Sequence, residues 1–269
     1  MSSIINPSEL TPFTIHEFKL FAPARVSQMN TFAYLDTGAD HITISPKLAE
    51  GLPRTGTITL GSAFEQRAFD TVENIEIDFL GNAHYINAHV NQIADGDLPF
   101  TTDVTLDAPT IFAKAIIFDF RLMGILLPKQ VSGELWIRLP TKFVENKGIC
   151  LIQLQSQNGA IYALFDTGAG LSVVNSAHIE EIRLDLQPDF ELEISDATGA
   201  KTNQKLALCS GLLVGNTVLP PFDCFSTDLQ VIEKALGCRI DMIFGANAML
   251  KSGFRWLFDK LANEAFVAV

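Results

Sequence analysis

The sequence lacks any apolar run long enough to cross a membrane, and its first 21 residues contain no apolar core of the kind that directs secretion. The run at residues 115–118 is far shorter than the roughly 18 apolar residues that a membrane helix needs. We therefore expect a soluble, cytoplasmic protein with no membrane partner.

Positive charge is also scarce, with 19 Lys and Arg against 31 Asp and Glu, which leaves a net charge of −12. Binding to nucleic acid requires clustered basic side chains, so a nucleic-acid partner is not expected. Intrinsic disorder is equally unexpected, because 48% of the residues are hydrophobic and only 19% are charged.

Motifs for metal binding and for nucleophilic catalysis are missing. The four cysteines show no CxxC spacing and are interpreted as reduced, mostly buried thiols: Cys150, Cys209, Cys224 and Cys238. The five histidines form no HExxH pattern. His41 follows Asp36 by five residues and is interpreted as a surface residue or as one that supports or borders the site of Asp36. There is no GxSxG elbow, and Ser172 is interpreted as a strand residue. We expect no metal and no cofactor.

What the sequence does contain is a repeat. Ala33-Tyr-Leu-Asp-Thr-Gly-Ala39 returns as Ala163-Leu-Phe-Asp-Thr-Gly-Ala169, about half the chain length further on. A second pair of landmarks is Gly124 and Gly245, each preceded and followed by apolar residues. Together they predict a duplication with domains 1–130 and 131–269, joined near residues 128–133, and a short helix after each glycine.

Each half is rich in short β-branched or aromatic segments separated by turn residues. Strands are predicted at 14–21, 31–35, 55–60, 72–79 and 84–90, and at 134–139, 149–155, 160–165, 190–194, 205–208 and 212–214. The clearest helix covers 228–236, with Gly237 as its stop signal. Trp136 and Trp256 are interpreted as core or packing aromatics. The predicted fold class is all-β, in two lobes with few short helices.

An Asp-Thr-Gly tripeptide after an apolar strand places an aspartate in a tight loop. Glycine allows a sharp turn and leaves room for a second backbone, while the threonine hydroxyl can bond to a neighbouring lobe. Two such loops facing each other would bring two carboxyl groups together, and such a pair shares one proton. One aspartate then acts as the base on a water molecule, and the other donates a hydrogen bond to a substrate carbonyl.

The doubled motif resembles the pepsin and retropepsin superfamily, for which the shared proton is well known. The Ala after each Asp-Thr-Gly, at Ala39 and Ala169, is more similar to the retropepsin branch. The chain looks like two retropepsin units fused into one. This resemblance implies two pseudo-symmetric closed-barrel lobes, an aspartic endopeptidase acting on extended peptides, and a monomer.

The resemblance also implies roles for individual residues. Asp36 and Asp166 match the catalytic aspartates, and Thr37 and Thr167 match the threonines that interlock the two loops. Gly38 and Gly168 match glycines whose carbonyls bind the substrate backbone. Asp40 matches an aspartate that contacts the substrate main chain, and the second half has Gly170 at that position. Two hairpin flaps are expected at 57–69, with Gly61 and Ser62 at its tip, and at 191–205, with Thr198 and Gly199 at its tip. The first flap has no tyrosine, unlike pepsin-like enzymes.

Two other interpretations remain open. The chain could be a non-catalytic protein that keeps the fold to bind a peptide or partner. It could also be a structural duplication in which the two aspartates lie far apart or are covered.

Overall fold

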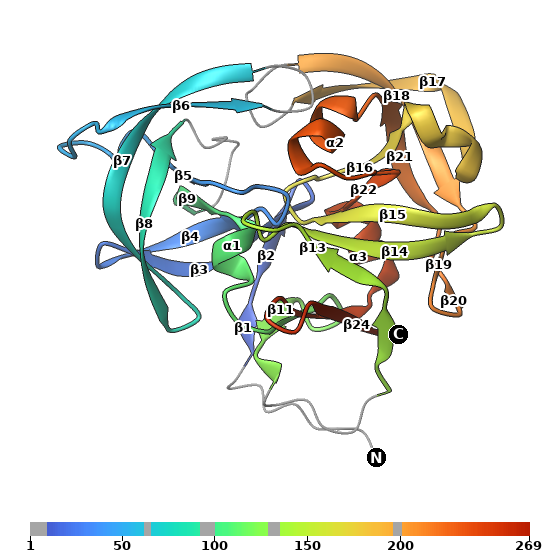
Figure 1. The fold of residues 1–269 in the computed structure, drawn as a ribbon, viewed down its shortest axis with the longest axis horizontal. Helices are drawn as coiled ribbons and strands as arrows, with labels where there is room; N and C mark the ends of the chain where they lie inside the picture. Colours follow the sequence, from blue (N-terminus) through green and yellow to red (C-terminus); the bar gives the residue numbers. More distant parts are fainter. Residues whose placement is uncertain (1–9, 62–65, 92–99, 129–134, 196–200) are drawn as a thin grey trace.

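The computed structural model describes residues 10–61, 66–91, 100–128, 135–195 and 201–269 (Figure 1). It is 56% strand and 11% helix, which confirms the prediction of a mostly β protein with few helices. In the described ranges, no helix combines the length and apolar character that crossing a bilayer would require.

Strands of the first half form an eight-stranded sheet in the order β2-β3-β4-β9-β5-β8-β7-β6. Their bounds are β2 (Thr14–His16), β3 (Lys19–Val26), β4 (Met29–Leu35), β5 (Ile42–Ile44), β6 (Gly56–Gly61), β7 (Gln66–Phe79), β8 (Asn82–Val90) and β9 (Thr102–Leu106). Strand β4 runs parallel to β9, and β5 runs parallel to β8. The predicted strand at 14–21 is wrong, because Glu17 and Phe18 adopt positive φ angles of 48° and 60° and separate β2 from β3.

Strands of the second half form a ten-stranded sheet whose main path is β17-β18-β21-β16-β22-β15-β14-β19-β20, with β13 paired to β14. Their bounds are β13 (Thr141–Phe143), β14 (Cys150–Ser156), β15 (Gly159–Asp166), β16 (Ser172–Asn175), β17 (Arg183–Ser195), β18 (Lys201–Ser210), β19 (Leu213–Val214), β20 (Thr217–Val218), β21 (Phe222–Thr227) and β22 (Met242–Gly245). Strand β15 runs parallel to β22, as β4 does to β9.

A third, six-stranded sheet takes strands from both halves, in the order β1-β11-β10-β23-β24-β12. Its bounds are β1 (Thr11–Pro12), β10 (Ile116–Asp119), β11 (Gly124–Leu126), β12 (Ile137–Leu139), β23 (Arg255–Asp259) and β24 (Glu264–Ala268). Strands β10 and β23 pair directly, with Phe118 opposite Trp256, and both side chains are fully buried. Burial of these large aromatics ties the two halves into one apolar core.

The helical segments are short: α1 (Ala108–Ile111), η3 (Ser176–Glu181), α2 (Gln230–Leu236) and α3 (Ala246–Ser252). Helix α2 confirms the prediction for 228–236 and ends at Gly237, which has a φ of 65°. Helix α3 follows Gly245 as predicted. The four cysteines are free, with three buried and Cys238 partly exposed.

The predicted correspondence between Gly124 and Gly245 is wrong, because Gly124 begins strand β11, whereas Gly245 ends strand β22 and is followed directly by helix α3. Asp107 occupies the place in the first half that Gly245 occupies in the second. The N–H of Ala108 donates to the C=O of Ala39 at 2.9 Å, and the N–H of Ala246 donates to that of Ala169 at 2.8 Å. The predicted join at 128–133 falls mostly outside the described residues.

Candidate active site

Two strands of similar construction deliver the aspartates. Asp36 directly follows β4, and Asp166 is the last residue of β15. The preceding residues, Leu35 and Phe165, are fully buried, which anchors each strand end in the core. The N–H of Asp36 donates to the C=O of Leu106 on β9 at 3.0 Å, and Asp166 is paired with Gly245 on β22.

Thr37 and Thr167 link the two loops reciprocally, and neither side chain is exposed. The hydroxyl of Thr37 donates to the C=O of Phe165 at 2.9 Å, and that of Thr167 donates to the C=O of Leu35 at 2.7 Å. Each hydroxyl also accepts the backbone N–H of the opposite threonine, at 2.9 and 3.2 Å. These buried bonds hold the two Asp-Thr-Gly loops at a fixed distance, because an unpaired buried polar group is costly.

Gly38 and Gly168 lie against the carboxyl group of the opposite half. A Cβ added to Gly38 would lie 2.3 Å from Oδ2 of Asp166, and one added to Gly168 would lie 2.3 Å from Cγ of Asp36. Neither glycine is among the positive-φ residues. Both glycines do lie in turns, as expected, but neither needs the left-handed backbone conformation that favours glycine. Glycine is needed because a side chain would collide with the opposite aspartate.

The two carboxyl groups lie close to each other, because each one rests against the glycine of the opposite Asp-Thr-Gly loop, so the interpretation in which the aspartates lie far apart is wrong. Both residues are half-buried, which leaves part of their surface accessible. Burial raises the pKa of both, and the charge of Asp166 raises the pKa of Asp36 further. Backbone N–H groups bond to Oδ1 of each, from Gly38 at 3.1 Å and from Gly168 at 2.8 Å. This arrangement favours one proton shared by the pair.

Asp40 has two cationic partners. Its Oδ1 lies 2.6 Å from Nδ1 of His41, and its Oδ2 bonds to Nζ of Lys147 from the second half. Burial alone would raise the pKa of Asp40, but hydrogen bonds from these two partners outweigh it and hold the pKa well below its usual range. The structure thus gives Asp40 a contact between the halves that sequence reasoning missed. Gly170 at the matching position makes no such ion pair and lies beside the backbone of Glu17.

Tyr34 is a further residue of the site that sequence reasoning missed. Its hydroxyl donates a hydrogen bond to the C=O of Gly168 in the opposite loop. Burial, followed by the charges of Asp36 and Asp166, raises its pKa well above the ordinary value. The strand period could have found it, because residues two apart on a strand point to the same face.

The two expected flaps are antiparallel hairpins, and Figure 1 shows both along the upper side of the molecule. In the first, β6 pairs with β7, and Gly61 is the last residue of β6, opposite Gln66. In the second, β17 pairs with β18 up to Ser195 and Lys201. The other predicted tip residues, Ser62, Thr198 and Gly199, lie outside the described residues.

No protein-family model matches this chain, and no curated protein matches it. The assignment of a function therefore rests on the geometry of the site.

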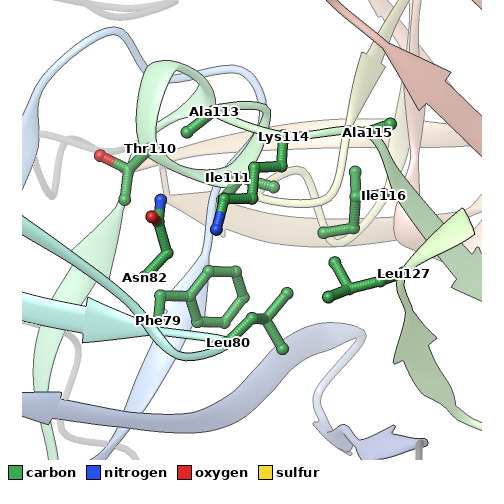
Figure 2. Close-up of a pocket in the computed structure, with 10 residues that line it drawn as sticks. All are labelled: Phe79, Leu80, Asn82, Thr110, Ile111, Ala113, Lys114, Ala115, Ile116 and Leu127. Carbon is green, nitrogen blue, oxygen red and sulfur yellow. The ribbon is translucent and has the colours of Figure 1, made fainter. Parts of the chain in front are cut away.

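Other features of the molecule do not add to this site. No group of three or more His, Cys, Asp or Glu within the described ranges could hold a metal ion. A small cavity of about 20 Å³ lies between α1, β10 and the β7–β8 turn. Its lining is mainly apolar and includes Phe79, Leu80 and Ile116 (Figure 2). It has room for about one water molecule, and none of the predicted site residues lines it.

Proposed function

We propose that this chain is an aspartic endopeptidase, which hydrolyses extended peptides with a water molecule activated by Asp36 and Asp166. The supporting observation is the close approach of the two half-buried carboxyl groups, each of which lies against the glycine of the opposite loop. Two neighbouring carboxylates repel each other, so such a pair lowers the stability of the fold. A pair that destabilises the protein is best explained by a role in catalysis. Raised pKa values at a partly exposed site are typical of catalytic groups.

The chemistry follows from the single shared proton. The ionised carboxylate removes a proton from a water molecule as the water oxygen attacks the carbonyl carbon of the peptide. The protonated carboxyl group donates its proton to the carbonyl oxygen, which forms a gem-diol. When the gem-diol collapses, the C–N bond breaks, the leaving nitrogen takes one proton, and a carboxylic acid and an amine are released. The pair ends with one proton, as it began.

We infer further that the eight- and ten-stranded sheets belong to two pseudo-symmetric, closed-barrel lobes of retropepsin type, 1–130 and 131–269. The matched parallel pairings of β4 with β9 and of β15 with β22 support this. The hairpins β6–β7 and β17–β18 are then the flaps, which exclude water and hold the substrate backbone. A chain that carries both aspartates should act as a monomer.

The test compares the wild type with Asp36→Asn and Asp166→Asn on a diverse peptide library from pH 3 to 8, read by mass spectrometry. Each substitution should lower kcat/KM by about 10²–10⁴-fold, the contribution typical of general acid–base catalysis. Asp78→Asn is the matched control, because Asp78 pairs with exposed Arg25 away from the loops and should leave cleavage unchanged. Full activity in either dyad variant would refute the mechanism.

Thermal unfolding of the same variants shows whether activity is lost through misfolding. The pKa of both carboxyl groups is higher in the folded protein than in the unfolded chain, where it is about 3.9. Their contribution to stability is therefore complete below about pH 3.9 and is lost as pH rises through the pKa of the folded state. Both dyad variants should therefore be at least as stable as the wild type at pH 7. If the wild type cleaves no peptide at any pH but binds peptides, a binding protein replaces the peptidase.

A further inference from the structure

The face of β4 (Met29–Leu35) that leads to Asp36 contains an aromatic side chain. On β4, Ala33 and Leu35 are fully buried on one face, while Phe32 and Tyr34 lie on the other face together with Asp36. Residues two apart on a strand share a face. On the face of β4 that leads to Asp36, Tyr34 is therefore the nearest side chain.

The ring of Tyr34 is held in place by packing. Its centroid lies 5.4 Å from that of Phe21 on β3, and Phe21 in turn contacts Phe100 edge-on at 5.2 Å. A ring fixed in this way keeps its hydroxyl on the Gly168 carbonyl without further loss of entropy. Because the pKa of Tyr34 is raised, the hydroxyl stays a donor over the whole neutral range.

The opposite half has no equivalent contact. Leu164 stands two residues before Asp166, as Tyr34 stands before Asp36, and its apolar side chain is buried. The Gly38 carbonyl accepts no hydrogen bond from the part of the chain that the structure describes. The two glycine carbonyls beside the dyad therefore differ: the one at Gly168 accepts the Tyr34 hydroxyl, and the one at Gly38 has no donor among the described residues.

We infer that Tyr34 is a specificity-determining residue, which makes the site hold a substrate main chain through Gly38 and not through Gly168. The inference rests on the proposed function. An extended peptide presents N–H groups that need acceptors, and a carbonyl oxygen that already accepts a hydroxyl is a weaker acceptor for a second donor, although it has two lone pairs. On the Gly168 side the site should accept a residue without a free N–H, such as proline or an N-alkylated residue, as readily as an ordinary one.

The test uses a cleaved peptide in which each backbone N–H near the scissile bond is replaced in turn by N-methyl. In the wild type, methylation at the position facing Gly38 should lower kcat/KM by about 3–10-fold, equal to one net hydrogen bond, and the mirror position should change by less than 2-fold. In Tyr34→Phe, which keeps the ring, the mirror position should become sensitive by about 3–10-fold. Leu164→Met is the matched control and should keep the wild-type profile.

An unchanged methylation profile in Tyr34→Phe, or equal sensitivity on both sides in the wild type, would overturn the inference. Tyr34→Leu, which copies the other half, is a second variant should the first fail to fold. If the wild type cleaves no peptide, the proposed function fails by itself. In that case the dissociation constants of the same peptides are measured by calorimetry. The effect of each N-methyl group on binding is then compared between the wild type and Tyr34→Phe.

Discussion

The close approach of Gly38 to the opposite aspartate can be measured as a coupling energy. A Cβ at Gly38 would lie 2.3 Å from Oδ2, 2.4 Å from Cγ and 2.7 Å from Oδ1 of Asp166. Carbon contacts are favourable at about 3.5–4.0 Å, so Gly38→Ala forces the carboxyl group or the loop to move by roughly 1 Å. We expect the substitution to destabilise the protein by about 1–3 kcal/mol, the usual effect of overpacking.

Gly38→Ala should change the free energy of unfolding in the opposite direction when the colliding atoms are absent. Asp166→Ala removes the three atoms that would lie nearest to a Cβ at Gly38. Gly38 does not have a positive φ, so alanine fits its backbone without strain. In the Asp166→Ala background, Gly38→Ala should therefore stabilise the protein by about 0.4–1 kcal/mol, because alanine restricts the unfolded chain.

Urea denaturation of the wild type, the two single variants and the double variant completes the cycle. The coupling energy, which is the difference between the two effects of Gly38→Ala, should be about 1.4–4 kcal/mol, and losses common to both backgrounds cancel. Gly56→Ala is the control, since its added Cβ would lie an ordinary 3.4 Å from Oγ1 of Thr71 and should not couple to Asp166. Equal effects of Gly38→Ala in both backgrounds would refute the described contact. In the peptidase assay, a displacement of this size should lower activity by about 10²-fold.

Two further predictions concern charges. Asp119→Ala should destabilise the protein by about 3–5 kcal/mol in urea denaturation, because it breaks a buried ion pair with Arg255, whose side chain is 3% exposed. Glu264→Ala, which breaks the exposed pair with Arg138, should cost under about 1 kcal/mol, and equal losses in the two variants would contradict this. Asp40→Asn should destabilise the protein by about 1 kcal/mol at pH 7. Since the pKa of Asp40 is lowered on folding, this difference should start to shrink as pH falls through the unfolded value of about 3.9, and it should be lost only as pH falls through the lower folded value. A difference independent of pH would contradict the ion pairing.

Local patterns in the sequence were sufficient for several features. The duplicated motif, the mostly β content, helix α2 with its stop at Gly237 and helix α3 after Gly245 were all predicted. These features depend on strand alternation and on residues whose φ preferences act within a few positions. The predictions that were wrong also depended on local pattern. The break in the strand at 14–21 was missed because no Gly or Pro marks the turn at Glu17 and Phe18, and Gly124 was matched to Gly245 only because both have apolar neighbours.

The sequence by itself determined that two identical acidic loops follow two apolar strands. The tertiary structure alone decided that these loops meet, that each glycine faces the other half's carboxyl group, and that Tyr34 and Lys147 join the site from one half each. The reason is that these contacts link residues separated by more than a hundred positions. Such contacts are set by how the sheets pack, and short-range pattern carries no information about that packing.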